Sequence, residues 1–151
     1  MNHIQAYNSH LDPTFEVLIV YPESSLYSTV NEHFKIAGHA FLVHDKKMII
    51  IDGATVEEQW FTKDHLMVIE AHEIGHHIAE HSVTNRVKPG PKMELEADWI
   101  GYQILKESGH LSAAKLHRAE YKSRYGKYPP SRSRFKYLAK KMAENKNIRA
   151  N

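Results

Sequence analysis

Apolar residues along this chain follow two different spacings, one in the first third and another beyond residue 62. In the first third, short apolar runs at 15–21, 40–43 and 48–51 are separated by turn residues. Such runs are typical of β-strands. The last two runs flank a polar turn at Asp45 and Lys46, and this arrangement predicts a hairpin.

Beyond residue 62, apolar residues recur every three or four positions, as on the buried face of a helix. A first helix is predicted from Thr62, whose side chain can serve as the N-cap, to about Val83. A second helix is predicted from Pro91, which suits a first helical turn, to about Ser108. The Pro-Gly-Pro sequence at 89–91 separates the two.

The C-terminal third carries two further helical patterns. Ser112 can cap a third helix that ends near Gly126, and residues 132–144 predict a strongly basic fourth helix. Strands followed by helices are typical of an α+β fold. With 151 residues, 42% of them hydrophobic, the chain is expected to form one domain over 1–151 around one core.

Composition and charge narrow the classes of protein. Cysteine is absent, which excludes a disulfide framework and a cysteine nucleophile. No apolar run approaches the roughly 20 residues of a membrane span, and no signal peptide is evident, so a cytoplasmic protein is expected. Residues 1–109 carry a net charge of −8 and residues 110–151 one of +10, which suggests that the C-terminal part meets an anionic partner or the acidic body itself.

The stretch EAHEIGHHIAEH, from Glu70 to His81, offers candidate chemistry. An α-helix turns by about 100° per residue, so His72 and His76 share one side, at the edge of the apolar stripe, with Glu73 beside them. Two imidazoles at this spacing can bind one zinc ion, and the glutamate between them is free to act on a zinc-bound water.

The alternative is chance, because twelve histidines make such pairs easy to find, and His77 and His81 form another. Those two histidines and Glu70 are expected on the solvent side of the helix. The apolar stripe is expected to face the core, and it consists of Met67, Val68, Ala71, Ile74, Gly75, Ile78 and Ala79.

A catalytic zinc usually has three protein ligands, so a third is needed. Ser82 occupies the position of the third histidine in metzincins, and Glu80 lies about 12 Å along the helix from His72. Glu94 and Asp98 lie one turn apart on the second helix. If that helix folds back, Glu94 becomes the third ligand and Asp98 can orient a ligating histidine. A solvent-exposed helix face is the competing interpretation of this pair.

Ala97 and Gly101 are small enough to let the two helices approach closely.

The motif pair, His72-Glu73-x-x-His76 followed by Glu94-x-x-x-Asp98, resembles the gluzincin branch of the zincin metallopeptidases. Over about residues 38–108 the chain looks most like the ImmA/IrrE-like peptidases of phages, mobile elements and bacteria, although these more often have Asn where this chain has Asp98.

The resemblance implies a minimal zincin fold, in which a small N-terminal sheet packs on the active-site helix and a mainly helical C-terminal part follows. It also implies one Zn²⁺ per chain, bound by His72, His76 and Glu94. Glu73 would be the general base and acid. The strand Met48–Asp52 would be the edge strand that lines the cleft.

The expected function is zinc-dependent hydrolysis of a protein or peptide substrate, such as a regulatory protein, in a host cytoplasm or a virion if the gene belongs to a phage. Residues 1–61 would supply strands, 62–109 the two zinc-site helices and 110–151 a basic helical part. Candidates for oxyanion stabilisation in that last part are His110, His117, Tyr121 and Tyr125. The alternative is a zinc-containing binding protein whose basic C-terminal helix contacts nucleic acid or an acidic protein.

Overall fold

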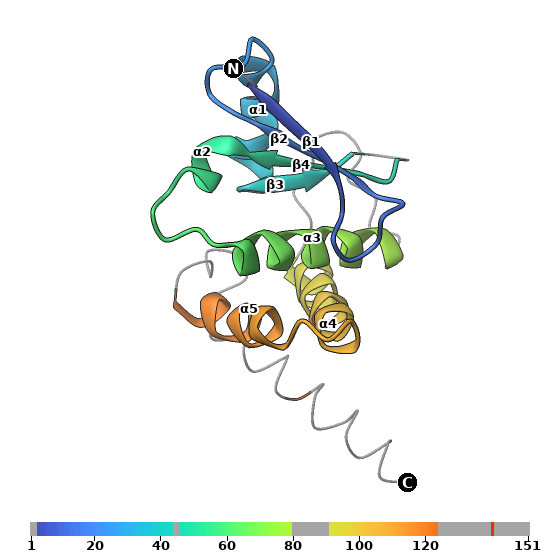
Figure 1. Cartoon of the computed structure of the whole chain (residues 1–151). Helices are drawn as coiled ribbons and strands as arrows, with labels where there is room; N and C mark the ends of the chain where they lie inside the picture. The colour runs from blue at the N-terminus through green and yellow to red at the C-terminus, as the bar shows by residue number, and fades with distance from the viewer. Residues whose placement is uncertain (1–2, 44–45, 80–90, 124–139, 141–151) are drawn as a thin grey trace, which may run out of the picture.

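The computed structural model describes residues 3–43, 46–79, 91–123 and 140. Strands dominate the first part of the chain and helices the second, which confirms the α+β class (Figure 1). Several predicted features lie wholly or partly outside the described residues. They are the basic helix 132–144 (apart from Lys140), the turn at 89–91, the helix end near Gly126, and the residues His81 and Tyr125. The elements are β1 Ile4–Asn8, β2 Glu16–Val20, α1 Tyr27–Ala37, β3 Ala40–Leu42, β4 Met48–Asp52, α2 Gly53–Val56, α3 Lys63–Ile78, α4 Pro91–Glu107 and α5 Leu111–Ser123.

The four strands form one sheet in the order β1-β2-β4-β3. β2 and β4 are parallel, and the other neighbouring pairs are antiparallel, including the predicted hairpin of β3 and β4. Successive side chains of a strand point to opposite faces. One face therefore gathers Val17, Ile19, Ile49 and Ile51, all at most 2% exposed, and packs against Ile74 of α3.

The expectation that Met48–Asp52 forms an edge strand is wrong, because β4 has a hydrogen-bonded neighbour on each side. Its three consecutive isoleucines suit an interior strand, where both faces are apolar. The edges of the sheet are β1 and β3.

The helix α3 forms the middle layer, with the sheet on one side and α4 and α5 on the other (Figure 1). On the side away from the sheet, Met67, Val68 and Ala71 pack with Tyr102 and Leu105 of α4 and with two alanines of α5. Both sides of α3 are therefore covered, so the assumption of a single apolar stripe facing a core and a solvated opposite side is too simple.

Two expectations about α3 need correction. Its last helical residue is Ile78, about one turn before the predicted end, and the backbone of Ala79 departs to φ −78° and ψ 0°. Ile78 was expected in the core but is 56% exposed. Because Ile78 is largely exposed, its burial contributes little to extending the helix.

The beginning of α3 follows the prediction. The Thr62 hydroxyl accepts a hydrogen bond from the backbone N–H of His65, and the imidazole Nδ1 of His65 accepts one from the backbone N–H of Thr62 at 3.1 Å. This reciprocal pair is a capping box in which histidine replaces the more usual glutamate. It fixes where the helix begins.

Small residues bring α3 and α4 together, as predicted for Ala97 and Gly101. A Cβ atom on Gly75 would lie 2.6 Å from the carbonyl oxygen of Ala97, and one on Gly101 would lie 3.0 Å from the backbone of Ala71. The two helix backbones are therefore in direct contact. This contact sets the distance between the side chains of α3 and those of Glu94 and its neighbours on α4.

The sequence did not reveal β1, α1 or the short α2. The residues of β1 alternate poorly between buried and exposed, and the N-cap position of α1 is Leu26, which provides no side-chain hydrogen bond. α5 begins at Leu111, one residue before the expected cap at Ser112. No helix in the described part of the chain is both long and apolar enough to cross a membrane.

Candidate metal centre

Three side chains from α3 and α4 converge on one point. The Nε2 atoms of His72 and His76 lie 3.1 Å apart. The two carboxylate oxygens of Glu94 lie 3.0 Å from Nε2 of His76 and 3.2 Å from Nε2 of His72. Both histidines are buried, and Glu94 is 16% exposed. The three side chains therefore present two nitrogens and a carboxylate as a compact set of donor atoms.

Asp98 lies behind this set. Its Oδ1 atom is 2.9 Å from Nδ1 of His72, and its side chain is fully buried. An Nδ1–H donated to Asp98 leaves the Nε2 lone pair of His72 pointing toward Glu94 and His76. Asp98 can therefore set both the tautomer and the orientation of the His72 ring.

Glu73 is also part of the cluster. Its side chain is buried, with 7% of the residue exposed. One of its carboxylate oxygens, one nitrogen of His72 and one nitrogen of His76 all lie within 4.8 Å of one another. This buried group could hold a metal ion. The carboxylate oxygens of Glu94 also lie within 3.2 Å of the two Nε2 atoms, so both glutamates are close to the histidine pair.

Burial and charge act on these groups in opposite directions. Burial raises the pKa of Glu73 to about 8, and the nearby carboxylate of Glu94 adds to the effect. Burial alone would lower the pKa of His72, but Glu94 and Asp98 outweigh it and raise this pKa to about 10. Burial also lowers the pKa of His76. The cluster therefore favours a positive charge at its centre, which a proton on His72 can supply.

The pKa of Glu94 also indicates that the cluster favours a positive charge at its centre. Burial of Glu94 would raise the pKa, but the two histidines lower it well below the usual range. Glu94 stays charged although it is only 16% exposed, which indicates strong local attraction between the groups of the cluster. A cation held between the donor atoms would satisfy this attraction in place of the proton.

The other residues considered from the sequence lie elsewhere. His77 is half-buried and packs edge-on against Phe15, with ring centroids 5.0 Å apart. His110 precedes α5, and the side chain of Tyr121 is not among those described. His117 is fully buried, and its Nε2 lies 2.9 Å from the backbone oxygen of Asp98. It therefore supports the backbone of α4 at the residue that orients His72.

One expectation about α3 is wrong, because Glu70 is not on a solvent-exposed face but is 0% exposed. Its carboxylate accepts hydrogen bonds from the hydroxyls of Tyr7 and Ser9, and from the backbone N–H of His10 at 2.9 Å. The Nδ1 atom of His10 lies 3.0 Å from it. The segment after β1 covers this side of α3, and nothing in the local spacing of residues signals such a cover.

No protein-family model, no curated protein and no solved structure matches this chain. The interpretation of the site therefore depends on its own geometry and chemistry.

Proposed function

We propose that this protein is a zinc-dependent metallopeptidase that hydrolyses peptide bonds. The observation that carries the proposal is the convergence of His72, His76 and Glu94, whose donor atoms lie 3.0–3.2 Å apart, next to the buried Glu73. Two imidazoles, one carboxylate and an adjacent glutamate that is not needed as a ligand form the set of groups that a zinc peptidase requires.

The spacing of the donor atoms fits zinc. Ligand atoms around a tetrahedral zinc, with bonds of about 2.0–2.1 Å, lie about 3.3 Å apart. The three distances here are 3.0, 3.1 and 3.2 Å, so a small outward adjustment would accommodate the ion. The contact between Asp98 and His72 matches the carboxylate that commonly holds the second nitrogen of a ligating histidine.

When bound, zinc would polarise the substrate carbonyl and lower the pKa of its water to about 7. Glu73 would take a proton from the attacking water and return it to the nitrogen of the leaving amine as the C–N bond breaks. Its carboxylate is then regenerated. Asp98 keeps the His72 ring in place throughout.

The edge strand β3, which lies against α3, could hold a substrate. The backbones of His39 and Val43 hydrogen-bond to β4, and hydrogen-bonded pairs alternate along an antiparallel ladder. The backbone groups of Ala40 and Leu42 therefore point to the outer edge of β3. An extended peptide could pair with them as an added strand, a role the sequence had assigned to β4.

Metal content tests the site first. Purified protein should contain about one zinc per chain, and His76→Ala should remove it. His77→Ala, which changes the neighbouring histidine outside the donor set, is the matched control and should keep the metal. A wild-type protein that binds no zinc, or equal zinc loss in both variants, would refute the assignment of the ligands.

Cleavage tests the reaction. Wild-type protein and Glu73→Gln should be incubated with peptides prepared from a proteome, and the products identified by mass spectrometry. The variant should keep zinc and lose about 10²–10⁴-fold in rate, as expected for removal of a general base. A zinc-loaded variant that cleaves as fast as wild type would contradict the mechanism.

A second candidate is a zinc-containing binding protein. The observation in its favour is the net charge of +10 on residues 110–151. Binding of duplex DNA should then weaken steeply as salt rises, because each neutralised phosphate releases counterions. Absent or salt-insensitive binding would remove nucleic acid as the partner and leave an acidic protein.

A further inference from the structure

A second candidate site lies at the opposite end of α3 from His76. A hollow of about 530 Å³ opens between β1 and the first turn of α3. Pockets for small molecules commonly measure about 300–1,000 Å³. The last residue of α3 that lines the hollow is Leu66, about 9 Å along the helix from His72. The hollow is therefore separate from the metal centre.

The walls of the hollow combine apolar surface with groups that donate hydrogen bonds. Tyr7, Val56, Phe61 and Leu66 supply the apolar part. The polar part consists of Gln5, Asn8, His10, Thr62 and Lys63. None of the described residues that line the hollow is Asp or Glu. A ligand with an apolar body and a negatively charged group would match this combination.

The polar groups are held in place by contacts behind the hollow. Glu70 is fully buried and accepts hydrogen bonds from the Tyr7 hydroxyl, 2.9 Å away, and from the backbone of His10. Nδ1 of His10 also faces this carboxylate, so Nε2, on the other edge of the ring, points away from it. The Glu70 carboxylate therefore has its hydrogen-bond partners within the protein, and it holds the side chains of Tyr7 and His10 in place.

The amide of Gln5 is oriented in a similar way. The Tyr21 hydroxyl donates to the Gln5 side-chain oxygen at 3.1 Å, which leaves the amide nitrogen as the donor toward a ligand. Lys63 adds a full positive charge at the start of α3. Hydrogen bonds between charged groups are roughly twice as strong as those between neutral ones, so Lys63 should dominate the choice of ligand.

We propose that this hollow binds a small amphipathic anion, with its apolar part between Tyr7 and Phe61 and its negative group beside Lys63. Such a ligand would join β1 to the first turn of α3. It would therefore stabilise the contact that also buries Glu70, and thermal unfolding should shift to higher temperature when the ligand is present.

The test uses 3-phenylpropionate and its neutral counterpart 3-phenylpropanamide as probes on isotope-labelled, zinc-loaded full-length protein. NMR should show shifts of the backbone amides of Tyr7, His10 and Lys63, with a dissociation constant of about 1 mM or tighter for the acid. The neutral amide should bind about tenfold more weakly, because it lacks the charge-assisted contact.

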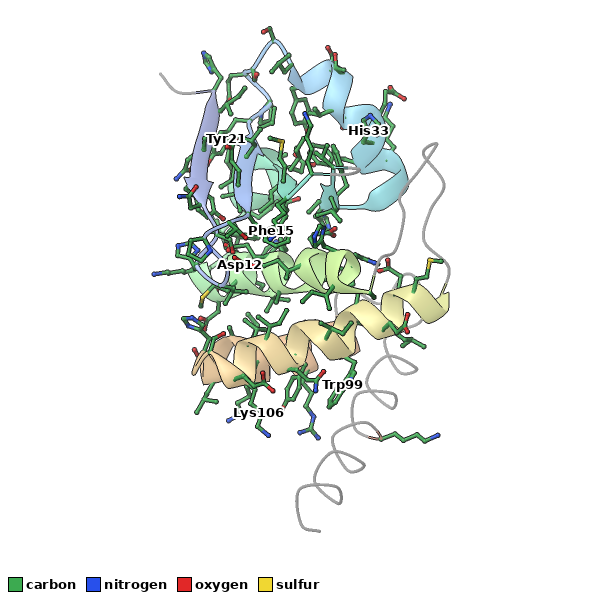
Figure 2. The ribbon with its side chains drawn as sticks, turned by 90° about the vertical axis from the view of Figure 1, so that its right-hand side faces the viewer. Asp12, Phe15, Tyr21, His33, Trp99 and Lys106 are labelled. Atoms are coloured by element: carbon green, nitrogen blue, oxygen red, sulfur yellow. The ribbon has the colours of Figure 1, made fainter. Side chains whose placement is uncertain are left out.

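Three variants locate the binding. Lys63→Gln should weaken binding of the acid about tenfold and leave binding of the amide nearly unchanged. Lys106→Gln is the matched control, since this exposed lysine projects from α4 on the far side of the helices (Figure 2), and it should have no effect. Asn8→Trp changes an exposed residue at the hollow and should block both probes by filling it.

Several results would overturn the proposal. One is the absence of shifts at the lining residues at about 10 mM of the acid. A second is shifts confined to His72 and His76, because a carboxylate can also bind zinc. A third is equal binding of the acid by wild type and Lys63→Gln. Loss of peptidase activity does not bear on the proposal, because the hollow contains no residue of the metal centre.

Discussion

The hydrogen bond between Asp98 and His72 allows a quantitative test of how the candidate metal centre is built. The two side chains are 2.9 Å apart, and Asp98 is fully buried, so solvent does not screen the contact. Asp98→Asn keeps the volume, and its amide oxygen can still accept the Nδ1–H of His72. The substitution therefore removes a charge without removing the hydrogen bond.

The expected loss follows from the strengths of the two kinds of bond. A hydrogen bond to a charged group contributes about 1.5–3 kcal/mol and a neutral one about 0.5–1.5 kcal/mol. Asp98→Asn should therefore cost about 1.4 kcal/mol of zinc binding, or roughly a tenfold weaker affinity. Asp98→Ala removes the bond altogether and should approach the upper end of the 10–100-fold range typical of such partners.

Zinc affinity should be measured by competition with a chromogenic chelator. Asp64→Asn, a half-buried carboxylate in the first turn of α3, is the matched control and should leave the affinity unchanged. In metal-free protein, Asp98→Asn should also lower the pKa of His72 from about 10, because one of the carboxylates that raise it is gone. Unchanged zinc affinity in both Asp98 variants would show that this contact does not support the site.

Four further outcomes test other parts of the structure. Gly75→Ala places a Cβ 2.6 Å from a backbone oxygen of α4 and should lower the free energy of unfolding in urea by about 1–3 kcal/mol; Gly101→Ala, at 3.0 Å, should cost less, and the reverse order would contradict the packing. Glu70→Gln replaces a buried acceptor of several donors and should cost about 1–3 kcal/mol while zinc content stays unchanged. In metal-free protein the raised pKa values of Glu73, about 8 against 4.5, and of His72, about 10 against 6.5, mean that the folded chain holds extra protons above pH 6.5, where the lowered pKa of His76 no longer offsets them. Stability should therefore fall as pH rises from about 6.5 to 10, and a rise over that range would refute the sign. Glu73→Gln should reduce this loss at pH 9 and make the metal-free protein more stable than wild type there, as measured by the urea midpoint.

The parts of the fold that the sequence predicts are those set by local chemistry. The hairpin of β3 and β4 follows from two apolar runs around a polar turn, and the start of α3 follows from Thr62. The approach of α4 to α3 follows from Ala97 and Gly101, because residues this small leave room for a neighbouring backbone. Each of these signals is contained within a few residues.

The parts that the sequence does not predict depend on distant segments. The position of β4 inside the sheet requires its parallel pairing with β2, about 30 residues earlier in the chain. The burial of Glu70 requires the segment after β1, in which Ser9 and His10 cover α3. A charged residue on a helix is usually exposed, so the spacing of residues alone gives the wrong answer for Glu70.

The candidate site shows the same division. His72, Glu73 and His76 form a local motif, and Glu94 and Asp98 could be selected because they lie one turn apart on the next helix. The contact of His117 with the backbone of Asp98 could not be predicted, since a histidine in α5 carries no signal for it.

The middle position of α3 explains why its polar residues are buried. Because layers cover it on both sides, Glu70, His72, Glu73 and His76 are all buried, and burial of charged groups is unfavourable unless partners offset it. Glu70 has its hydrogen-bond donors, and the histidines have Glu94 and Asp98. Glu73 differs, because burial dominates its environment and raises its pKa to about 8. A carboxylate kept in such a place destabilises the fold, and a strongly perturbed group beside two histidines and a second carboxylate marks a candidate functional site.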